Sequence, residues 1–563
     1  MRRAAWLIVV LLLASCVSIE FTGGEPTPDP SAAMPLLPSP TPLPGGATVA
    51  ARIASRGVLV VGIRYDLPPF GYVTDEGTVA GFDVDLGREF ARRWLGSSEA
   101  VQFRQVRSDT AVEHLRAGDV DLVLAALAHT QPREAGADFT LPYFRDGQAL
   151  LVRAPDAAAI AGPSSLSGLR VGVVAWDEAA DALRAAVPFT LTFQTYDRFD
   201  QAVGALTRGE VDAVAGLRQR LFRGQWLAPG TAVVGQYTSV PVAMAYPQND
   251  AFFADLVNLT FQEMVADGTY ATLYARWFGA DPVPAVERWP GSERPALAEA
   301  PPALPVPDTI GAIARRGRLA VALVAGRAPF AAVDETGNPV GYEVNLVRLM
   351  AERWLGDPSA VDLIPTTPEG ALGLVESGQA DLVIGGLAHT RAAELALDFS
   401  QTTYVAGEGL LVLAGDNSIA DLPSLAGRQV AVVQGSASGE VLLAAAQAAG
   451  VALSVVPQPT LEAAIALLQE GQVAAVAADR ALLLGPAYAT PGLVVLPLRL
   501  TEVPLALGLP AGDSAFRDLV NLTLQVLKVE GQFDALYAVW FDDAPPALEV
   551  WPGAPYRALR LGG

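Results

Sequence analysis

Apolar runs and amphipathic stretches alternate along most of the chain. Phe82, Leu86, Phe90 and Trp94 recur every four residues, which marks one face of a helix. A second helix is predicted over residues 177–186. Short apolar runs of strand length lie between such stretches, at residues 58–63, 101–106, 120–127, 170–174 and 211–215. Because strands alternate with helices, the pattern predicts an α/β fold with mainly parallel sheets flanked by helices.

The second half of the chain repeats the first. Matching segments are offset by 260 to 263 positions, far more than the period of a solenoid repeat. The chain is therefore predicted to hold two tandem copies of one domain. The matches are FDVDL (82–86) with YEVNL (342–346), WLG (94–96 and 354–356), LAHT (127–130 and 387–390), NLT (258–260 and 521–523) and WPG (289–291 and 551–553).

The repeat also sets the predicted domain boundaries. The first copy is expected over residues 49–281 and the second over residues 307–542. Residues 282–306, rich in Pro, Ala and Glu, are predicted as a linker, and residues 543–563 as a C-terminal tail. Each copy is large for a single sheet, so we expect two α/β lobes per copy.

The N-terminus has the features of a secretory signal. The chain starts Met-Arg-Arg, and residues 4–14 are apolar, too few to cross a bilayer. Residues 1–15 are therefore predicted to be a signal peptide. The sequence LASC at 13–16 resembles a bacterial lipobox, which would make Cys16 the lipidated residue. The alternatives are an ordinary signal that ends near a cysteine and a twin-arginine signal, which the missing polar stretch disfavours.

Residues 16–48 are rich in proline and lack periodicity, so we expect a semi-extended tether. No later run of about 20 uncharged apolar residues follows, and no membrane-spanning helix is predicted. The diacyl cysteine typical of a lipobox would satisfy the need for more than one lipid chain in stable anchoring. The expected protein is a folded extracytoplasmic body, tied to a membrane by lipid.

Composition excludes several functions. The 38 basic and 60 acidic residues give a net charge of −22, and so acidic a surface repels phosphate backbones, which argues against nucleic-acid binding. Cys16 is the only cysteine, and the chain has three histidines. A disulfide, a cysteine-based zinc site, a multi-histidine metal centre and a Ser-His-Asp triad are therefore not expected, and no cofactor is predicted.

A series of motifs in the first copy resembles bacterial extracellular solute-binding proteins of family 3, the polar amino acid type that serves ABC importers. The shared order of the motifs over nearly the whole copy carries the resemblance, since no single motif is specific. They are VGIRYDLPPFGY (61–72), GFDVDL (81–86), GDVDLV (118–123), HTQPR (129–133), DFTLPY (138–143), GEVDAV (209–214), GTY (268–270) and WFG (277–279).

The resemblance implies a periplasmic-binding-protein fold of type II, in which two lobes joined by two crossing strands close on a ligand. The second lobe of each copy would span about residues 154–236 and 415–500. The segments that match the crossing strands are residues 149–153 and 240–246 in the first copy and 410–414 and 503–509 in the second.

The same resemblance assigns ligand contacts in the first copy. A buried amino acid needs a cation for its carboxylate and an acid for its ammonium, because unpaired buried charge is costly. The arginine of the family's Thr-x-x-Arg corner, which binds the carboxylate, falls on Arg133. The alternative is that Arg133 pairs with Glu134 or Asp138 at the surface. The other matching positions are Asp66, Leu67, Phe70, Ala126 and Ala128, the last two through backbone groups.

The second lobe of the first copy departs from the family. Where the family has a Gly-Thr-Thr-like turn that binds the carboxylate through free N–H groups, this chain has Ala-Trp-Asp-Glu at 175–178. Asp177 would oppose a carboxylate there but could accept an ammonium; alternatively it caps the helix. The position of the family's ammonium-binding acid is Leu217.

The second copy shows the complementary loss. Asp479 falls on the ammonium-binding acid, whereas Ala393 replaces the carboxylate arginine. Arg327 and Arg391 are candidate substitutes, or else solvated surface arginines. The remaining positions that match the family's ligand contacts are Phe330, Gly386, Ala388 and Ser436. His129 and His389 match each other beside the corner, where a shared structural hydrogen bond within the first lobe is expected, in preference to a ligand-binding or pH-sensing role.

The resemblance implies a lipoprotein that captures small polar solutes, amino acids or related carboxylates, for an ABC permease, without enzymatic activity. One alternative is a sensor or partner-binding lipoprotein with one degenerate module. The other is a dehydratase-like enzyme on the same fold, which needs a positioned acid–base pair. The available acids for that chemistry are Asp177 with Glu178, and Asp479.

Overall fold

The computed structural model describes residues 48–175, 179–279, 281–302, 305–334, 336–541 and 543–553. Cys16, the rest of the predicted signal and tether up to residue 47, and Asp177 lie outside these residues. Both predicted copies belong to one unit that runs from Pro40 to Gly563. Within the described residues, no helix is long and apolar enough to span a membrane.

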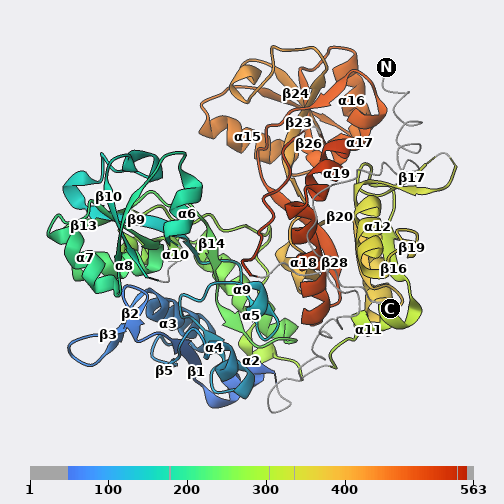
Figure 1. The fold of residues 1–563 in the computed structure, drawn as a ribbon. Coiled ribbons are helices and arrows are strands. Elements are labelled where there is room, and N and C mark those ends of the chain that lie inside the picture. The colour runs from blue at the N-terminus through green and yellow to red at the C-terminus, as the bar shows by residue number, and fades with distance from the viewer. Residues whose placement is uncertain are drawn as a thin grey trace, which may run out of the picture. The chain divides into compact units, whose positions relative to one another are not determined.

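Module 1, the first copy, contains two five-stranded sheets with helices packed around them (Figure 1). The lobe 1 sheet has the order β5-β1-β6-β15-β7 and the lobe 2 sheet the order β11-β10-β12-β9-β13. The strands are β1 (Leu59–Ile63), β5 (Val101–Gln105), β6 (Leu122–Val123), β7 (Asp138–Phe139), β9 (Gln148–Arg153), β10 (Arg170–Val174), β11 (Thr192–Tyr196), β12 (Ala213–Leu217), β13 (Thr231–Val234) and β15 (Ala245–Tyr246).

Module 2 repeats this arrangement. Its lobe 1 sheet has the order β19-β16-β20-β28-β21, with β22 beside β28, and its lobe 2 sheet the order β25-β24-β26-β23-β27. The strands are β16 (Leu319–Val324), β19 (Val361–Thr366), β20 (Leu382–Ala388), β21 (Asp398–Phe399), β22 (Tyr404–Ala406), β23 (Glu408–Leu413), β24 (Gln429–Val433), β25 (Ser454–Gln458), β26 (Ala475–Asp479), β27 (Leu493–Val495) and β28 (Val503–Leu509).

Helices follow the strands in the same order in both modules. Those of module 1 are α2 (Val49–Arg56), α3 (Phe82–Leu95), α4 (Ala111–Ala117), α5 (Gln131–Glu134), α6 (Ala179–Ala186), α7 (Phe199–Thr207), α8 (Arg218–Leu227), α9 (Ala251–Ala266) and α10 (Thr269–Phe278). Those of module 2 are α11 (Thr309–Arg316), α12 (Tyr342–Leu355), α13 (Pro368–Glu376), α14 (Arg391–Glu394), α15 (Ser438–Ala448), α16 (Leu461–Gln469), α17 (Arg480–Ala489), α18 (Ser514–Val529) and α19 (Gln532–Trp540). The predicted α/β class and the two tandem copies are confirmed.

One strand of each sheet runs against the others. In module 1 these strands are β15 and β9, each antiparallel to both of its neighbours. In module 2 they are β28 and β23. Each of them carries the chain into a lobe directly from the crossing between lobes. The sheets are therefore mainly parallel, as predicted. The antiparallel strand of each sheet is the strand by which the chain enters that lobe.

The crossing itself requires glycine. In module 1, β8 (Phe144–Asp146) pairs with β14 (Val240–Val242), and Gly147 follows at φ +150°. A Cβ at Gly147 would lie 2.0 Å from the Thr238 carbonyl oxygen, and one at Gly407 would meet Thr501 in the same way. The crossing thus lies at Gly147, before the predicted segment 149–153. That segment belongs to β9, inside the lobe 2 sheet, because its residues pair with β12 and β13.

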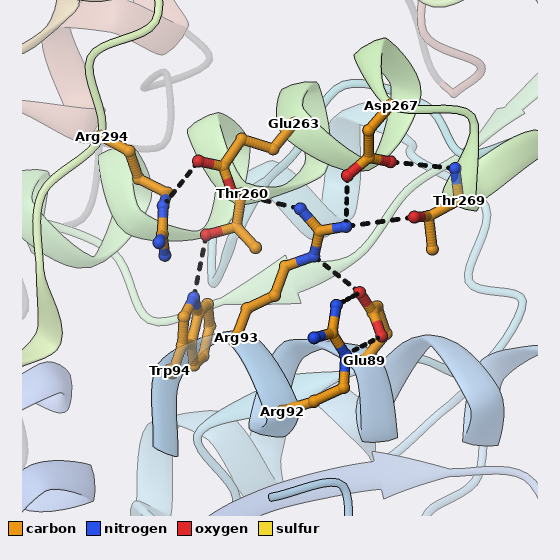
Figure 2. A network of polar contacts seen from close by, with 9 residues as sticks. All are labelled: Glu89, Arg92, Arg93, Trp94, Thr260, Glu263, Asp267, Thr269 and Arg294. Atoms are coloured by element: carbon orange, nitrogen blue, oxygen red, sulfur yellow. Dashed lines mark hydrogen bonds and ion pairs between the residues drawn. The ribbon is translucent and has the colours of Figure 1, made fainter. Parts of the chain in front are cut away.

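The predicted helix face of module 1 packs against α10 through Phe82, and its last residue, Trp94, reaches α9. The indole N–H of Trp94 donates to the Thr260 hydroxyl at 2.9 Å, and Arg93 reaches Glu263, Asp267 and Thr269 (Figure 2). In module 2, Trp354 and Thr523 make the same bond at 2.9 Å. The repeated WLG and NLT segments therefore meet in the tertiary structure, which explains why both recur.

A buried ion pair joins the lobes of each module. Arg218, at the start of α8 in lobe 2, pairs with Asp281, which follows α10 of lobe 1. In module 2, Asp543 binds Arg480 at 3.0 Å and Arg499 at 2.7 Å. The side chains of Arg480 and Asp543 are only 3% and 12% exposed, so little water screens this pair.

We predict that Asp543→Asn destabilises module 2 by about 3 kcal/mol, because it leaves two arginines without their buried counter-charge. Thermal unfolding of the purified chain measures the effect. Asp109→Asn is the control, since the Asp109 and Arg107 side chains are 63% and 76% exposed and such pairs contribute about 0–1 kcal/mol. Equal shifts in the two variants would contradict the prediction.

Candidate functional site

A buried carboxyl group orders the turn that leads to the predicted arginine corner. In module 1, Asp83 is fully buried in the first turn of α3 and accepts the Ala126 N–H at 3.1 Å and the Tyr143 hydroxyl at 2.9 Å. Ala126 has φ +47°, a conformation that non-glycine residues rarely adopt. The backbone groups of Ala126 and Ala128 were predicted to bind the ligand. The Ala126 N–H instead donates to Asp83 of the protein.

Module 2 builds the same turn with a longer acid and two glycines. Glu343 accepts the N–H groups of Gly385 at 2.6 Å and Gly386 at 2.9 Å. Burial raises the pKa of Asp83 and that of Glu343 to about 7. The Gly386 N–H thus holds the turn, like that of Ala126, and is not left for a ligand. The other matching position, Ala388, pairs with Leu505 in the lobe 1 sheet.

Arg133 lies beside the loops that follow two strands of lobe 1. Its guanidinium donates to the Ala128 carbonyl at 2.6 Å and to the Ser108 carbonyl at 3.3 Å, in loops that follow β6 and β5. Within the described part of the chain no carboxylate pairs with Arg133, and burial lowers the pKa of its guanidinium. The two alternative partners are engaged elsewhere, Glu134 with His129 and Asp138 with Arg517. A half-buried cation at the carboxyl ends of parallel strands is suited to an anionic ligand.

The remaining predicted ligand contacts of lobe 1 differ in their exposure to solvent. Asp66 is exposed and paired with Arg64 at 2.7 Å, which lowers the pKa of Asp66. Leu67 is 8% exposed and belongs to the lobe 1 core cluster. Phe70 is fully buried against Phe144 and Phe278 and belongs to the same core cluster. Its contact with a ligand stays a prediction.

Phe330 of module 2 is fully buried in the same way, against Tyr404 and Phe541. Arg391, a candidate substitute for the carboxylate arginine, lies against residues that follow module 1. It is buried beneath residues 290–291, where its N–H donates to the Pro290 carbonyl at 2.9 Å. Ser436 is exposed, and its hydroxyl donates to the Val433 carbonyl at 2.8 Å.

Two carboxylates stand side by side in lobe 2 of module 2. Asp479, at the end of β26, is directly opposite Glu408, at the start of β23. Burial raises the pKa of both groups; Arg327 opposes the shift at Asp479, and the Ser438 hydroxyl opposes it at Glu408. Among the described residues, the Oε2 atom of Glu408 is buried without a hydrogen-bond partner. The charges of Arg327, from lobe 1, and of Arg480, in the same lobe, both lower the pKa of Asp479 against the effect of burial.

Glu408 was missed by sequence reasoning. Its counterpart in module 1 is Gln148, which faces Leu217 across the same pair of strands. Both members of the pair are thus acidic in module 2 and neutral in module 1. The 260-residue offset of the repeat aligns Glu408 with Gln148, so the sequence does show that an acid replaces a neutral residue there. Only the strand register shows that Glu408 faces Asp479.

The lobes of each module approach each other beside these groups. The Tyr72 ring of lobe 1 packs on Trp226 of α8 with centroids 5.1 Å apart. In module 2, Gly485 of α17 lies so near the Ala328 carbonyl that a Cβ would be 3.1 Å from it. Two α/β lobes joined by crossing strands, with charged groups at their approaching edges, define a bilobal solute-binding protein.

The chain belongs to the bacterial extracellular solute-binding proteins, family 3, whose profile matches residues 59–280 and 319–543. It is 27% identical over 279 residues to the ABC transporter glutamine-binding protein GlnH of Bacillus subtilis, a match that covers 49% of this chain and 95% of the relative. It is 27% identical to the L-cystine-binding protein TcyJ of Escherichia coli, which covers 41% of this chain and 86% of that protein.

Solved structures match one module at a time. An ancestral cationic amino acid solute-binding protein is 28% identical, with a TM-score of 0.37, and the match covers 41% of this chain and 100% of that chain. An ancestral arginine-binding protein bound to arginine is 31% identical, with a TM-score of 0.31, over 40% of this chain and 99% of that chain.

The buried acid of α3 predicts a pH dependence. Because the pKa of Asp83 is about 7 in the folded state and about 4 when exposed, the folded state binds more protons between these values. Stability supplied through Asp83 is therefore present below pH 4 and falls as pH rises to 7. We predict that Asp83→Asn flattens this fall, measured as thermal midpoints from pH 4.5 to 8. Asp75→Asn, in an exposed loop, should keep the wild-type slope, and an unchanged slope in Asp83→Asn would contradict the assignment.

Proposed function

We propose that this chain is a lipid-anchored solute receptor whose two modules hold ligands of different charge and deliver them to an ABC permease. Family membership supports the binding role, and relatives named as binding proteins of ABC transporters support the permease. The lipobox-like LASC at 13–16 and the proline-rich residues 16–48 support the anchor. In this proposal the protein binds its solutes without converting them.

The observation that carries the proposal is a set of charged side chains in each module that form no ion pair with the described residues. In module 1, Arg133 faces the end of the lobe 1 sheet with two backbone carbonyls and no carboxylate among the described residues. An anionic group, such as the carboxylate of an amino acid, would pair with the Arg133 guanidinium through charge-assisted hydrogen bonds.

Module 2 has the opposite requirement. Asp479 and Glu408 are adjacent and partly buried, and one Glu408 oxygen has no hydrogen-bond partner in the described part of the chain. A cationic group would relieve the repulsion between the two acids and satisfy that oxygen, since buried like charges are costly. Arg327, whose charge reaches Asp479, would then take an anionic group of the same solute. The proposed ligand of module 2 is an amino acid or amine with at least one exposed ammonium or guanidinium.

For module 1 we predict that Arg133→Ala lowers the affinity for a carboxylate solute by about 10- to 100-fold, the value of one or two charged hydrogen bonds. Isothermal titration of the body that follows the tether, against amino acids and small carboxylates, measures it. Arg107→Ala removes an exposed arginine nearby and should bind like the wild type. Unchanged affinity in Arg133→Ala would contradict the assignment.

For module 2 we predict that Asp479→Asn and Glu408→Gln each weaken the binding of cationic solutes and leave carboxylate binding by module 1 unchanged. Both substitutions keep the side-chain shape and remove only the charge. Titration with arginine, lysine and small diamines tests this. Full affinity in the double variant would refute the acidic-pair site, and silence of both modules across the panel would favour the sensor alternative.

A further inference from the structure

The two WPG segments lie in the parts of the chain that leave each module. We define exit segment 1 as residues 281–302 and exit segment 2 as residues 543–553. Each is fixed to its own module through a glutamine of the last long helix: Gln262 accepts the Trp289 N–H at 3.3 Å, and Gln525 accepts the Trp551 N–H at 2.9 Å. Arg294 adds a bond to Glu263 at 3.0 Å, as Figure 2 shows.

Each tryptophan then stacks on a histidine of the other module. The Trp289 ring lies on His389 with centroids 4.0 Å apart, and the Trp551 ring lies on His129 at 4.3 Å. The opposite faces of these histidines stack on Phe399 and Phe139 of their own sheets, at 4.4 and 4.5 Å. The His129 and His389 rings are further fixed by Glu134 and Glu394, which confirms the predicted structural bond. Both tryptophans are only 6% exposed.

Backbone contacts repeat the exchange on both sides. The Arg391 N–H donates to the Pro290 carbonyl at 2.9 Å, and the Gln131 N–H donates to the Pro552 carbonyl at 3.0 Å. Next to these bonds are Gly291 and Gly553, both at positive φ; a Cβ at Gly553 would lie 2.9 Å from Pro132. The WPG segment that follows each module thus makes equivalent contacts with the other module.

A second set of bonds joins the two modules directly. Arg517 of α18 binds Asp138 of module 1 at 2.7 Å and Asp398 of its own module at 3.0 Å. Ser514 donates to Asp138 at 2.7 Å and accepts the Asn249 N–H at 2.9 Å. All these residues belong to lobe 1 of their modules, or to the segment that continues it.

We propose that the two exit segments are reciprocal clasps, by which each module binds lobe 1 of the other, so that the tandem is an intramolecular pseudo-dimer that does not need its covalent linker. The partner of each WPG segment is the slot formed by His389 or His129 beside its phenylalanine. In this assembly the crossings at Gly147 and Gly407 still connect the two lobes of one module each. The proposal does not rest on the solute-binding role.

The test uses the full chain with a protease recognition sequence inserted after Pro305, which is exposed and follows exit segment 1. After cleavage, the two fragments should elute together in size-exclusion chromatography at micromolar concentration. In the double variant Trp289→Ala/Trp551→Ala they should separate, with at least a 100-fold weaker association, because two stacked tryptophans are lost. Trp226→Ala is the matched control, since this tryptophan lies in lobe 2 and is 50% exposed.

A second variant guards against a folding defect. Gly553→Val leaves both tryptophans and both sheets intact but places a side chain against Pro132, and it should also weaken association. Circular dichroism and thermal unfolding of the uncut variants establish that they fold. Separation of the wild-type fragments after cleavage would overturn the proposal. So would a folded double variant, or a folded Gly553→Val variant, whose fragments stay together as tightly as those of Trp226→Ala.

Discussion

The fold of each module depends on a carboxyl group buried in the first turn of a helix. Asp83 accepts a backbone N–H group from the turn after β6, and Glu343 accepts two from the irregular stretch of β20. Burying those N–H groups unpaired would be costly. The bonds therefore hold the turn in its left-handed conformation, and that turn leads to the corner with Arg133. A buried residue thus positions the backbone that leads to Arg133.

The connection between lobes obeys a steric constraint. Two strands cross so closely that at Gly147 and Gly407 a Cβ would lie within 2.0 Å of a carbonyl oxygen. The chain then enters each sheet through one reversed strand, which gives all four lobes the same strand order. A buried arginine and an aspartate that follows the last helix tie the lobes beside this crossing.

On this common scaffold the two modules carry different charges. Arg133 stands where module 2 has Ala393, and Leu217 stands where module 2 has Asp479. Glu408 adds a second acid to module 2. Leu217 and Asp479 lie at strand ends, and Arg133 and Ala393 lie in the short helices α5 and α14. In the proposed function, these exchanges change the ligand group that the module requires from an anion in module 1 to a cation in module 2.

The sequence by itself determined the duplication, the α/β class, the family, and the helix and strand positions such as α3 and β10. These features follow from local periodicity, or from comparing the chain with itself. Only the tertiary structure decided that Phe70 belongs to the core, that Glu408 faces Asp479, and that Arg391 lies beneath residues 290–291 of module 1. It also showed that residues 281–302 and 543–553 do not form a simple linker and tail but bind the opposite module. Each of these facts is a contact between segments far apart in the chain, and local patterns of hydrophobicity do not record which distant surfaces meet.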